Sequence, residues 1–193
     1  MVEPITLVTQ RLQLRPWRES DRDPFAMLNA DPRVMEHFPS TLDRERSDAL
    51  VDRIEAEFAE QGWGLWAVEV VDGAEFCGFI GMAAAEHALG RPAIEVGWRL
   101  AHEHWGHGYA PEGGLACLRF AFDDLGLDEI VSFTVPANVN SRRVMEKIGL
   151  HLVGDIEHQG LPPDSPHRHH VLYALTVEEW RTGPRWPGRI TPR

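Results

Sequence analysis

Short runs rich in apolar residues recur along the chain, and in the first of them apolar and polar residues alternate, a spacing typical of a half-buried β-strand. The first run is RLQLRPW at residues 11–17. Further runs follow at residues 64–71, 76–85, 94–100, 129–135, 152–156 and 170–175. The pattern therefore predicts about seven strands.

Helical spacing marks segments between these strands. Residues 43–61 carry apolar side chains on one helical face, and Gly62 is expected to end that helix. Pro111 is expected to open a second long helix, and residues 141–149 are expected to form a shorter one. Ser20 is expected to cap a short helix after the first strand. Antiparallel strands followed by one βαβ-like crossover predict a mixed α/β fold.

The size and composition suit one domain with a substantial core. The chain has 193 residues, of which 43% are hydrophobic. We expect a single domain over residues 1–180, followed by a loose Pro-rich tail at residues 181–193.

The charge balance is acidic, with 30 Asp and Glu residues against 19 Lys and Arg residues and a formal net charge of −11. Such a surface repels the phosphates of nucleic acids and anionic lipids, so neither nucleic acid nor membrane is expected as a partner. It attracts cationic ligands such as amines, although the same charge can serve solubility alone.

The two cysteines, Cys77 and Cys117, both lie in apolar runs. Free buried thiols in a reducing cytoplasm are the expected state, rather than a disulfide. The N-terminal residues show no signal-peptide pattern, and the longest apolar stretch is too short to cross a bilayer. We therefore expect a cytoplasmic protein.

The segment WGHGYAPE, residues 105–112, joins a predicted strand to a predicted helix. Gly106 and Gly108 allow backbone N–H groups to turn inward and a ligand to approach closely. The helix opened by Pro111 adds its first free N–H groups and the positive end of its dipole. The segment predicts either a phosphate site made of backbone or an ordinary strand-to-helix turn.

A second polar segment, ANVNSRRVMEKIGL, follows the next predicted strand. Asn138 and Asn140 offer side-chain amides, and Ser141 enters a helix. Taken alone, these residues predict no more than a helix cap.

Together, the two segments resemble the GCN5-related N-acetyltransferases (GNAT), and most closely the RimJ/RimL branch of ribosomal-protein N-terminal acetyltransferases. WGHGYAPEG is similar to that branch's WGxGYAxEA loop, and ANVNSRRVMEKIGL to its NxxSxxVxEKxGF segment. The resemblance runs from the first strand through Trp180 and implies the GNAT fold. That fold is a mixed, mostly antiparallel sheet flanked by helices, with a CoA cleft where the fourth and fifth strands splay apart.

The resemblance implies acetyl-CoA as the acetyl donor. The glycine loop would wrap the pyrophosphate, and the backbone of Trp98 and Leu100 would pair with the pantetheine amides. Asn138, Asn140 and Ser141 would face the pantetheine and the thiol. The loop residues expected to contact the cofactor are Trp105, Gly106, His107, Gly108, Tyr109, Ala110 and Pro111.

Two residues are candidates for the chemistry. Many relatives use a tyrosine as the acid where this chain has Met145, so the resemblance assigns protonation of the leaving thiolate to Ser141. The alternative is that Ser141 only caps its helix. Glu95 is the candidate base, because it shares a strand face with Gly97, which leaves room for a substrate. The alternative is an ion pair between Glu95 and Arg99 on that face.

The resemblance therefore predicts transfer of an acetyl group from acetyl-CoA to a primary amine. The transfer is expected to be direct, within a ternary complex, because neither cysteine has a basic neighbour in sequence that suggests an activated thiolate. The acceptor is expected to be cationic, either a peptide or protein N-terminus or a small amine. In the first of three loops expected to face it, Met35, His37 and Phe38 form an apolar lip with one polar member. These loops are residues 31–41, 87–92 and 159–169. A homodimer is a further expectation.

Two other functions stay open. A CoA-binding regulator without catalysis would account for Met145 in place of the tyrosine. A metal-binding module would use His102, His104 and His107 of HEHWGH, together with HRHH at residues 167–170. Because HEHWGH overlaps the glycine loop and has no cysteine partner, we expect no bound metal.

Overall fold

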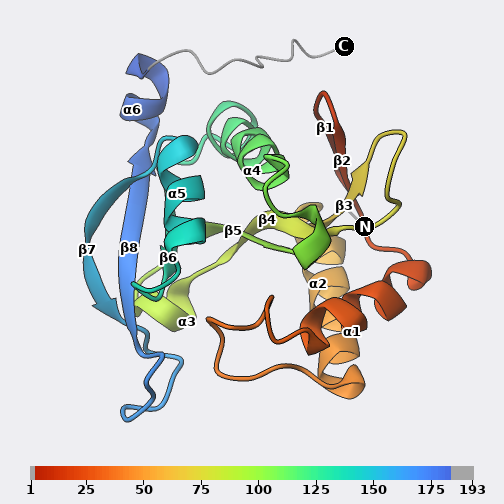
Figure 1. The fold of residues 1–193 in the computed structure, drawn as a ribbon. Helices are drawn as coiled ribbons and strands as arrows, with labels where there is room; N and C mark the ends of the chain where they lie inside the picture. The colour runs from red at the N-terminus through yellow and green to blue at the C-terminus, as the bar shows by residue number, and fades with distance from the viewer. Residues whose placement is uncertain (1–2, 184–193) are drawn as a thin grey trace.

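The computed structural model describes residues 3–183 (Figure 1). The strands are β1 (Leu7–Val8), β2 (Leu12–Arg15), β3 (Leu65–Val70), β4 (Gly78–Ala84), β5 (Ile94–Leu100), β6 (Glu129–Thr134), β7 (His151–Glu157) and β8 (His169–Thr176). The α-helices are α1 (Arg22–Ala30), α2 (Arg44–Gln61), α3 (Glu86–Leu89), α4 (Tyr109–Arg119), α5 (Val139–Lys147) and α6 (Val177–Thr182). Short 3-10 turns lie at η1 (Glu19–Asp21) and η2 (His102–His104), and a π-helical turn, η3 (Phe120–Asp124), extends α4.

The described strands form one eight-stranded sheet in the order β1-β2-β3-β4-β5-β6-β8-β7. Within that sheet, all neighbours run antiparallel except β5 and β6, which are parallel. The mixed, mostly antiparallel sheet flanked by helices is therefore confirmed. It has one strand more than expected, because Leu7 and Val8 pair with β2. So short a run carries no alternation that a sequence pattern could reveal.

The strands β5 and β6 separate after a single aligned pair of residues, Glu95 and Val131. On its other edge, β5 pairs with β4 along its whole length, from Ile94 to Leu100. The edge of β5 that faces β6 therefore has no strand partner over residues 96–100 within the described sheet. These are the fourth and fifth strands of the sequence prediction, and their separation is as expected.

Capping residues fix the ends of the long helix α2 as the sequence predicts. The Asp43 carboxylate accepts a hydrogen bond from the Arg46 N–H at 2.9 Å. Gly62 ends the helix in a left-handed conformation with a φ of +79°, which a residue with a Cβ adopts only at a cost.

The prediction for Ser20 is wrong, because Ser20 lies inside η1 and Asp21 organises the entry into α1. The Asp21 carboxylate accepts a hydrogen bond from the Arg18 N–H at 2.8 Å. It also binds the Arg15 guanidinium at 2.7 Å in a buried ion pair. A charge-assisted pair of this kind is stronger than a serine hydroxyl cap.

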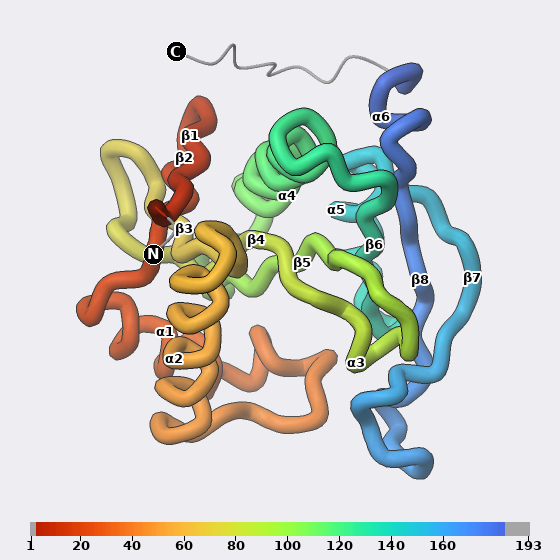
Figure 2. Tube along the Cα trace, turned by 180° about the vertical axis from the view of Figure 1, so that it is seen from behind, coloured from red at the N-terminus to blue at the C-terminus, as the bar shows by residue number. Residues whose placement is uncertain are grey.

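Helices cover both faces of the sheet. On one face, α4 packs so closely on β4 that a Cβ at Gly113 would lie 2.5 Å from the Ile80 side chain. On the other face, Phe25 of α1 packs edge-on against Phe79 of β4, with ring centroids 6.1 Å apart. Figures 1 and 2 show α1 beside α2, and α4 beside α5, in separate parts of the molecule.

Adjacent residues of β5 point to these two faces. Trp98 pairs in register with Ile80 and therefore lies on the α4 face. Glu95, Gly97 and Arg99 lie on the α1 face, as the strand period of two requires. Glu95, the predicted base, therefore lies on the opposite face of the sheet from the Trp98 side chain and α4.

The last helix, α6, begins with the capping box that the sequence predicts, since Thr176 and Glu179 exchange side-chain and backbone hydrogen bonds. It continues to Thr182, so the first two residues of the predicted tail belong to it. Residues 184–193 of that tail lie outside the described residues, and the single domain over residues 1–180 stays a prediction. In the described part of the chain, no helix is long and apolar enough to cross a membrane.

Candidate active site

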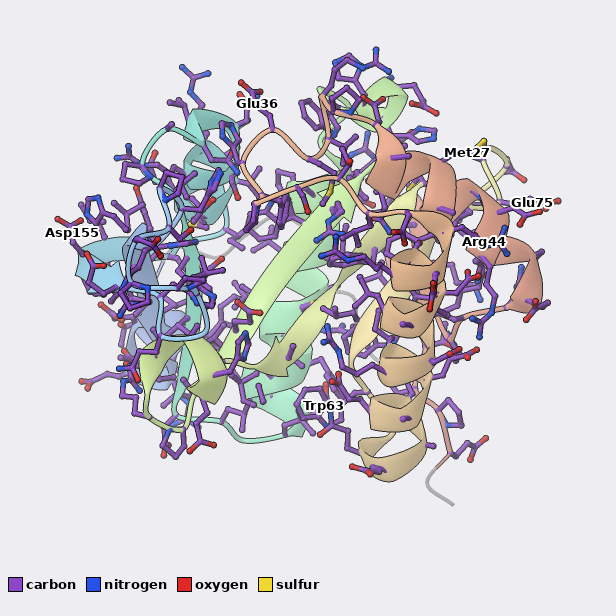
Figure 3. All side chains as sticks on the ribbon, turned by 90° about the horizontal axis from the view of Figure 1, so that it is seen from below. Met27, Glu36, Arg44, Trp63, Glu75 and Asp155 are labelled. Atoms are coloured by element: carbon purple, nitrogen blue, oxygen red, sulfur yellow. The ribbon has the colours of Figure 1, made fainter. Side chains whose placement is uncertain are left out.

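A cleft of about 1090 Å³ opens where β5 and β6 separate. Its walls come from β5, the starts of α4 and α5, and loops at the strand ends. Glu36 stands on one of these loops, between α1 and α2 (Figure 3). The predicted site residues that line the cleft are Glu95, Trp98, Leu100, Trp105, Gly106, Gly108, Tyr109, Ala110, Pro111, Asn138, Asn140 and Ser141.

The glycine loop adopts a conformation that other residues avoid. Gly106 and Gly108 have φ angles of +77° and +81°, and a Cβ at Gly106 would meet no described atom within 4 Å. The loop backbone is therefore open and leads into the first turn of α4 at Tyr109. Such N–H groups at a helix start suit an anion. His107 differs from its neighbours, because it does not line the cleft. Its exposed side chain contacts the Trp105 carbonyl through Nδ1 at 2.9 Å.

Glu112, in the first turn of α4, ties the glycine loop to the N-terminal strands. Its carboxylate accepts hydrogen bonds from the Thr9 hydroxyl at 2.6 Å and from the Arg11 N–H and Nε at 2.9 and 2.7 Å. Arg11 also donates to the His107 carbonyl at 2.9 Å and lies over the Tyr109 ring. Burial alone would raise the pKa of Glu112, but these hydrogen bonds and the Arg11 charge lower it below its usual value.

The unpaired edge of β5 offers backbone groups to an extended ligand. One of them is already engaged, since the Leu100 carbonyl accepts a hydrogen bond from the Trp105 indole Nε1 at 2.8 Å. A ligand amide paired at Leu100 would share that carbonyl with Trp105. No described side chain hydrogen-bonds to the Trp98 backbone. Of the two predicted pantetheine contacts, the backbone of Trp98 is therefore the one without a competing side chain.

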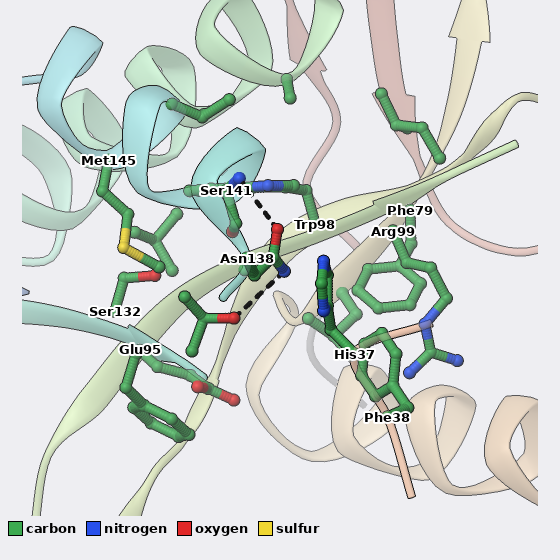
Figure 4. A pocket seen from close by; sticks show the side chains of 18 of the residues that line it. His37, Phe38, Phe79, Glu95, Trp98, Arg99, Ser132, Asn138, Ser141 and Met145 are labelled. Atoms are coloured by element: carbon green, nitrogen blue, oxygen red, sulfur yellow. Dashed lines mark hydrogen bonds between the residues drawn. The ribbon is translucent and has the colours of Figure 1, made fainter. Parts of the chain in front are cut away.

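The predicted helix cap is confirmed, and Asn138 supplies it. Its Oδ1 accepts a hydrogen bond from the Ser141 N–H at 3.1 Å, and its Nδ2 donates to the Thr134 hydroxyl at 3.1 Å (Figure 4). The alternative that Ser141 only caps the helix is therefore wrong. Ser141 lies on the cleft, and its hydroxyl makes no hydrogen bond among the described contacts. Met145 is buried beside it, whereas Tyr173 lies outside the cleft lining.

Glu95 lies in the cleft on the α1 face of β5. Burial raises the pKa of its carboxyl group to about 7. Part of the side chain still meets solvent through the open cleft. The alternative of an ion pair with Arg99 is wrong, because four residues of strand separate the two Cα atoms by about 13 Å. Between them, a Cβ at Gly97 would meet no described atom within 4 Å, so the floor of the cleft is open there.

Arg99 is a cleft residue whose surroundings the sequence did not reveal. Its Nη1 donates to the Asn29 Oδ1 at 2.6 Å. Its guanidinium lies 4.3 Å from the Phe38 ring centroid and 5.4 Å from that of Phe79 (Figure 4). Its Nε atom is buried without a hydrogen-bond partner. Burial lowers the pKa of Arg99 to about 10, which leaves the guanidinium charged at neutral pH.

All three loops that the sequence predicts to face the acceptor reach the cleft. Met35 is an exception to the predicted lip, because it is buried in the hydrophobic core. His158 and His170 lie just outside the predicted third loop and also line the cleft. Burial lowers the pKa of both. The cleft residues from the three loops are Val34, Glu36, His37, Phe38, Pro39, His87, Leu161 and His167.

The two cysteines are free and buried, and neither lines the cleft. Burial raises the pKa of Cys77 to about 12 and raises that of Cys117 as well, so neither thiol is a ready nucleophile at neutral pH. Within residues 3–183, no group of three His, Cys, Asp or Glu side chains is placed to hold a metal ion. The metal-binding alternative therefore lacks a ligand set in that part of the chain.

The sequence matches the family described as an acetyltransferase (GNAT) domain over residues 11–151. The FsC-acetyl coenzyme A-N(2)-transacetylase of Aspergillus fumigatus is 32% identical over 185 residues, which cover 91% of this chain and 77% of that protein. The acetyltransferase structure from Agrobacterium tumefaciens is similar with a TM-score of 0.74 at 28% identity, and the match covers 91% of this chain and 96% of that one. Mycobacterium smegmatis RimJ in complex with CoA-disulfide shares the fold, with a TM-score of 0.72 at 24% identity and coverage of 91% and 89%.

The family match includes β5, the glycine loop and α5, which are the elements that build the cleft. Both solved structures match this fold over 91% of the chain. This chain is therefore a member of the GNAT family of acetyltransferases.

Proposed function

We propose that this acetyl-CoA-dependent acetyltransferase transfers the acetyl group directly to a primary amine held with acetyl-CoA in a ternary complex. The observation that carries the proposal is the position of Glu95 on the open floor of the cleft, with a pKa raised by burial to about 7. A base whose pKa is close to the working pH is partly ionised and still accepts a proton readily. Glu95 would take the proton that the attacking amine loses.

Acetyl-CoA, when bound, supplies an activated thioester. The open N–H groups at Gly106 and Gly108 fit its diphosphate, because no Cβ fills the loop. The unpaired edge of β5 near Trp98 fits the extended pantetheine arm. The Ser141 hydroxyl, which Asn138 leaves uncommitted, would donate to the sulfur as the carbon–sulfur bond breaks.

The acceptor is proposed to be an amine that the acidic surface attracts, since the net charge is −11. By its name, the Aspergillus fumigatus relative transfers an acetyl group from coenzyme A to an N(2) position, which supports a nitrogen acceptor here. A peptide N-terminus and a small amine both stay candidates. A cytoplasmic location, a homodimer and the lack of a bound metal are further proposals. A CoA-binding regulator without catalysis is the alternative.

The test is acetyl-CoA consumption against a panel of peptides, polyamines and amino acids over a range of pH. We expect turnover whose rate rises with pH through an apparent pKa of about 7, because Glu95 must be ionised to act. Glu95→Gln should lower kcat by about 10²-fold and move the rise to higher pH, since solvent must then deprotonate the amine.

Glu57→Gln is the matched control, because Glu57 lines the same cleft from α2 and has no assigned role in the chemistry. This variant should keep the wild-type pH profile. Turnover of any amine would exclude the regulator without catalysis. A Glu95→Gln profile identical to that of the wild type would show that Glu95 is not the base.

A further inference from the structure

The Arg99 guanidinium lies in the wall of the cleft, and most of its N–H donors have no acceptor among the described residues. A guanidinium carries five N–H donors, and Asn29 accepts from Nη1 alone. The Nε donor is buried and has no partner. Glu57 lines the same cleft, but no described carboxylate lies within ion-pair distance of Arg99. A buried charged donor without an acceptor is costly, and such groups are rare in folded proteins.

Arg15 shows how the same chain satisfies a buried arginine. Its Nη1 and Nη2 atoms donate to Asp21 at 2.7 and 2.9 Å, and its Nε donates to Glu69 at 2.8 Å. Arg99 has the same geometry of donors but lacks both carboxylates. The contrast indicates that the acceptor for Arg99 comes from outside the chain.

The contacts of Arg99 with the loop between α1 and α2 do not remove this need. Phe38 and Phe79 present ring faces to the guanidinium, and Asn29 uses one N–H. These contacts hold Arg99 in place and would help to fasten the loop. They supply no acceptor for Nε, which the protein encloses, or for Nη2, which a ligand can reach, so a purely structural role leaves the Nη2 donor unused.

The α1 face of β5 forms a trough with Glu95 at one end and Arg99 at the other. Their Cα atoms lie about 13 Å apart along the strand. Gly97 lies between them, with open space above it. A ligand whose amine reaches Glu95 would therefore run over Gly97 toward the guanidinium.

We propose that the acetyl acceptor carries a carboxylate remote from its reacting amine and that Arg99 binds this carboxylate. The proposal rests on the proposed function and names the chemical class of its acceptor. A carboxylate suits a guanidinium, and it would accept from Nη2, which makes no described hydrogen bond and is not among the buried unpaired atoms. Because the two Cα atoms lie about 13 Å apart and both side chains line the cleft, we expect the amine and the carboxylate to be about 6–10 Å apart. This is about the length of a chain of four to six methylene groups or of two to three peptide residues.

The acidic surface and the Arg99 guanidinium act on different ends of such an acceptor. The net charge of −11 attracts its ammonium group from a distance. Arg99 acts only at contact, because it is half-buried inside the cleft. A molecule with both charges satisfies both features, whereas a polyamine satisfies only the first.

The test measures kcat/KM for a series of unbranched ω-amino carboxylates with about two to seven methylene groups between the amine and the carboxyl carbon. Each carboxylate is compared with its carboxamide. Each pair shares the amine and differs in the anionic charge. Wild-type enzyme should prefer the carboxylate by about 30-fold or more in kcat/KM at the optimal length, and much less at the shortest lengths. Short peptides with a free or an amidated C-terminus, run in parallel, separate amino acids from peptides as the source of the carboxylate.

Arg99→Met keeps the length and the apolar stem but removes the charge, so the preference should fall to within about threefold. Arg99→Lys should keep part of the preference, because it restores the charge without the planar fork. Arg53→Met is the matched control: Arg53 is an exposed arginine that lines the same cleft from α2. It should leave the preference intact.

Binding of the N-acetylated products, measured by calorimetry in the presence of CoA, gives a readout that does not need catalysis. Carboxylate-selective binding that Arg99→Met abolishes would support the anion site even if no amine were turned over, and the proposed function alone would then fail. Turnover or product binding without carboxylate preference would overturn the inference, as would a preference that survives in a folded Arg99→Met. If Arg99→Met does not fold, the wild-type comparison of carboxylates with carboxamides decides.

Discussion

The carboxyl group of Glu95 is ionised less readily in the folded protein than in the unfolded chain. Its pKa rises from 4.5 to about 7 because burial disfavours the charged form. Between these values the unfolded chain releases the proton and the folded protein holds it. The free energy of unfolding therefore falls as pH rises from about 4.5 to about 7, and the whole penalty is present above that range.

Glu95→Gln should remove this penalty. At a pH of about 8 the variant should be more stable than the wild type by about 1–3 kcal/mol, and near a pH of about 4 the two should be equal. Urea denaturation of both proteins across this range measures the difference. A pH-independent difference would mean that the raised pKa is absent. A more stable but slower variant would show that the site holds its base at a cost in stability.

At the scale of elements, Glu112 joins α4 and the glycine loop to the turn before β2. Glu112→Gln keeps the shape but removes the charge, and it cannot accept from Thr9 and Arg11 as a carboxylate does. The loop should then be held less firmly, and the dissociation constant of acetyl-CoA should rise by about 5–30-fold.

Calorimetric titration with CoA measures this effect, and Arg11→Met should give a similar loss because it removes the other half of the tether. Glu103→Gln is a control, since Glu103 lies in the nearby turn η2 and has no described bond to the loop. Equal CoA binding by Glu112→Gln and the wild type would mean that the loop holds its shape without the tether.

Elements with local signals could be predicted from the sequence, and contacts between distant segments could not. Asp43 and Gly62 mark the ends of α2 because a cap needs only neighbouring residues. The glycine loop was predicted for the same reason. Asn138 and Ser141 were both candidates for one cap, and only the structure assigns it to Asn138.

Arg99 illustrates the limit of sequence reasoning. The sequence offered Glu95 as its partner because the two residues share a strand face. Its actual partner, Asn29, lies 70 positions away in the chain. A contact of this kind depends on how α1 docks on the sheet, which no local pattern encodes.

At the scale of the whole molecule, the core encloses both thiols and separates them from the cleft. Replacement of Cys77 and Cys117 by alanine should leave turnover largely unchanged, because the proposed direct transfer forms no acetylated cysteine. The stability cost should be about 1 kcal/mol for each site. Mass spectrometry of the wild type incubated with acetyl-CoA alone should find no acetylated cysteine, and a trapped thioester would contradict direct transfer.

Because β5 and β6 share only one aligned pair of residues, the described sheet has a gap between these two strands. Acetyl-CoA would load from the side that α4 covers, and the acceptor from the side that α1 covers. Neither substrate would then block the other, so either could bind first, and the acetylated product could leave while CoA is still bound. The gap would admit only the amine end of the acceptor, while its carboxylate stays at Arg99 on the α1 side.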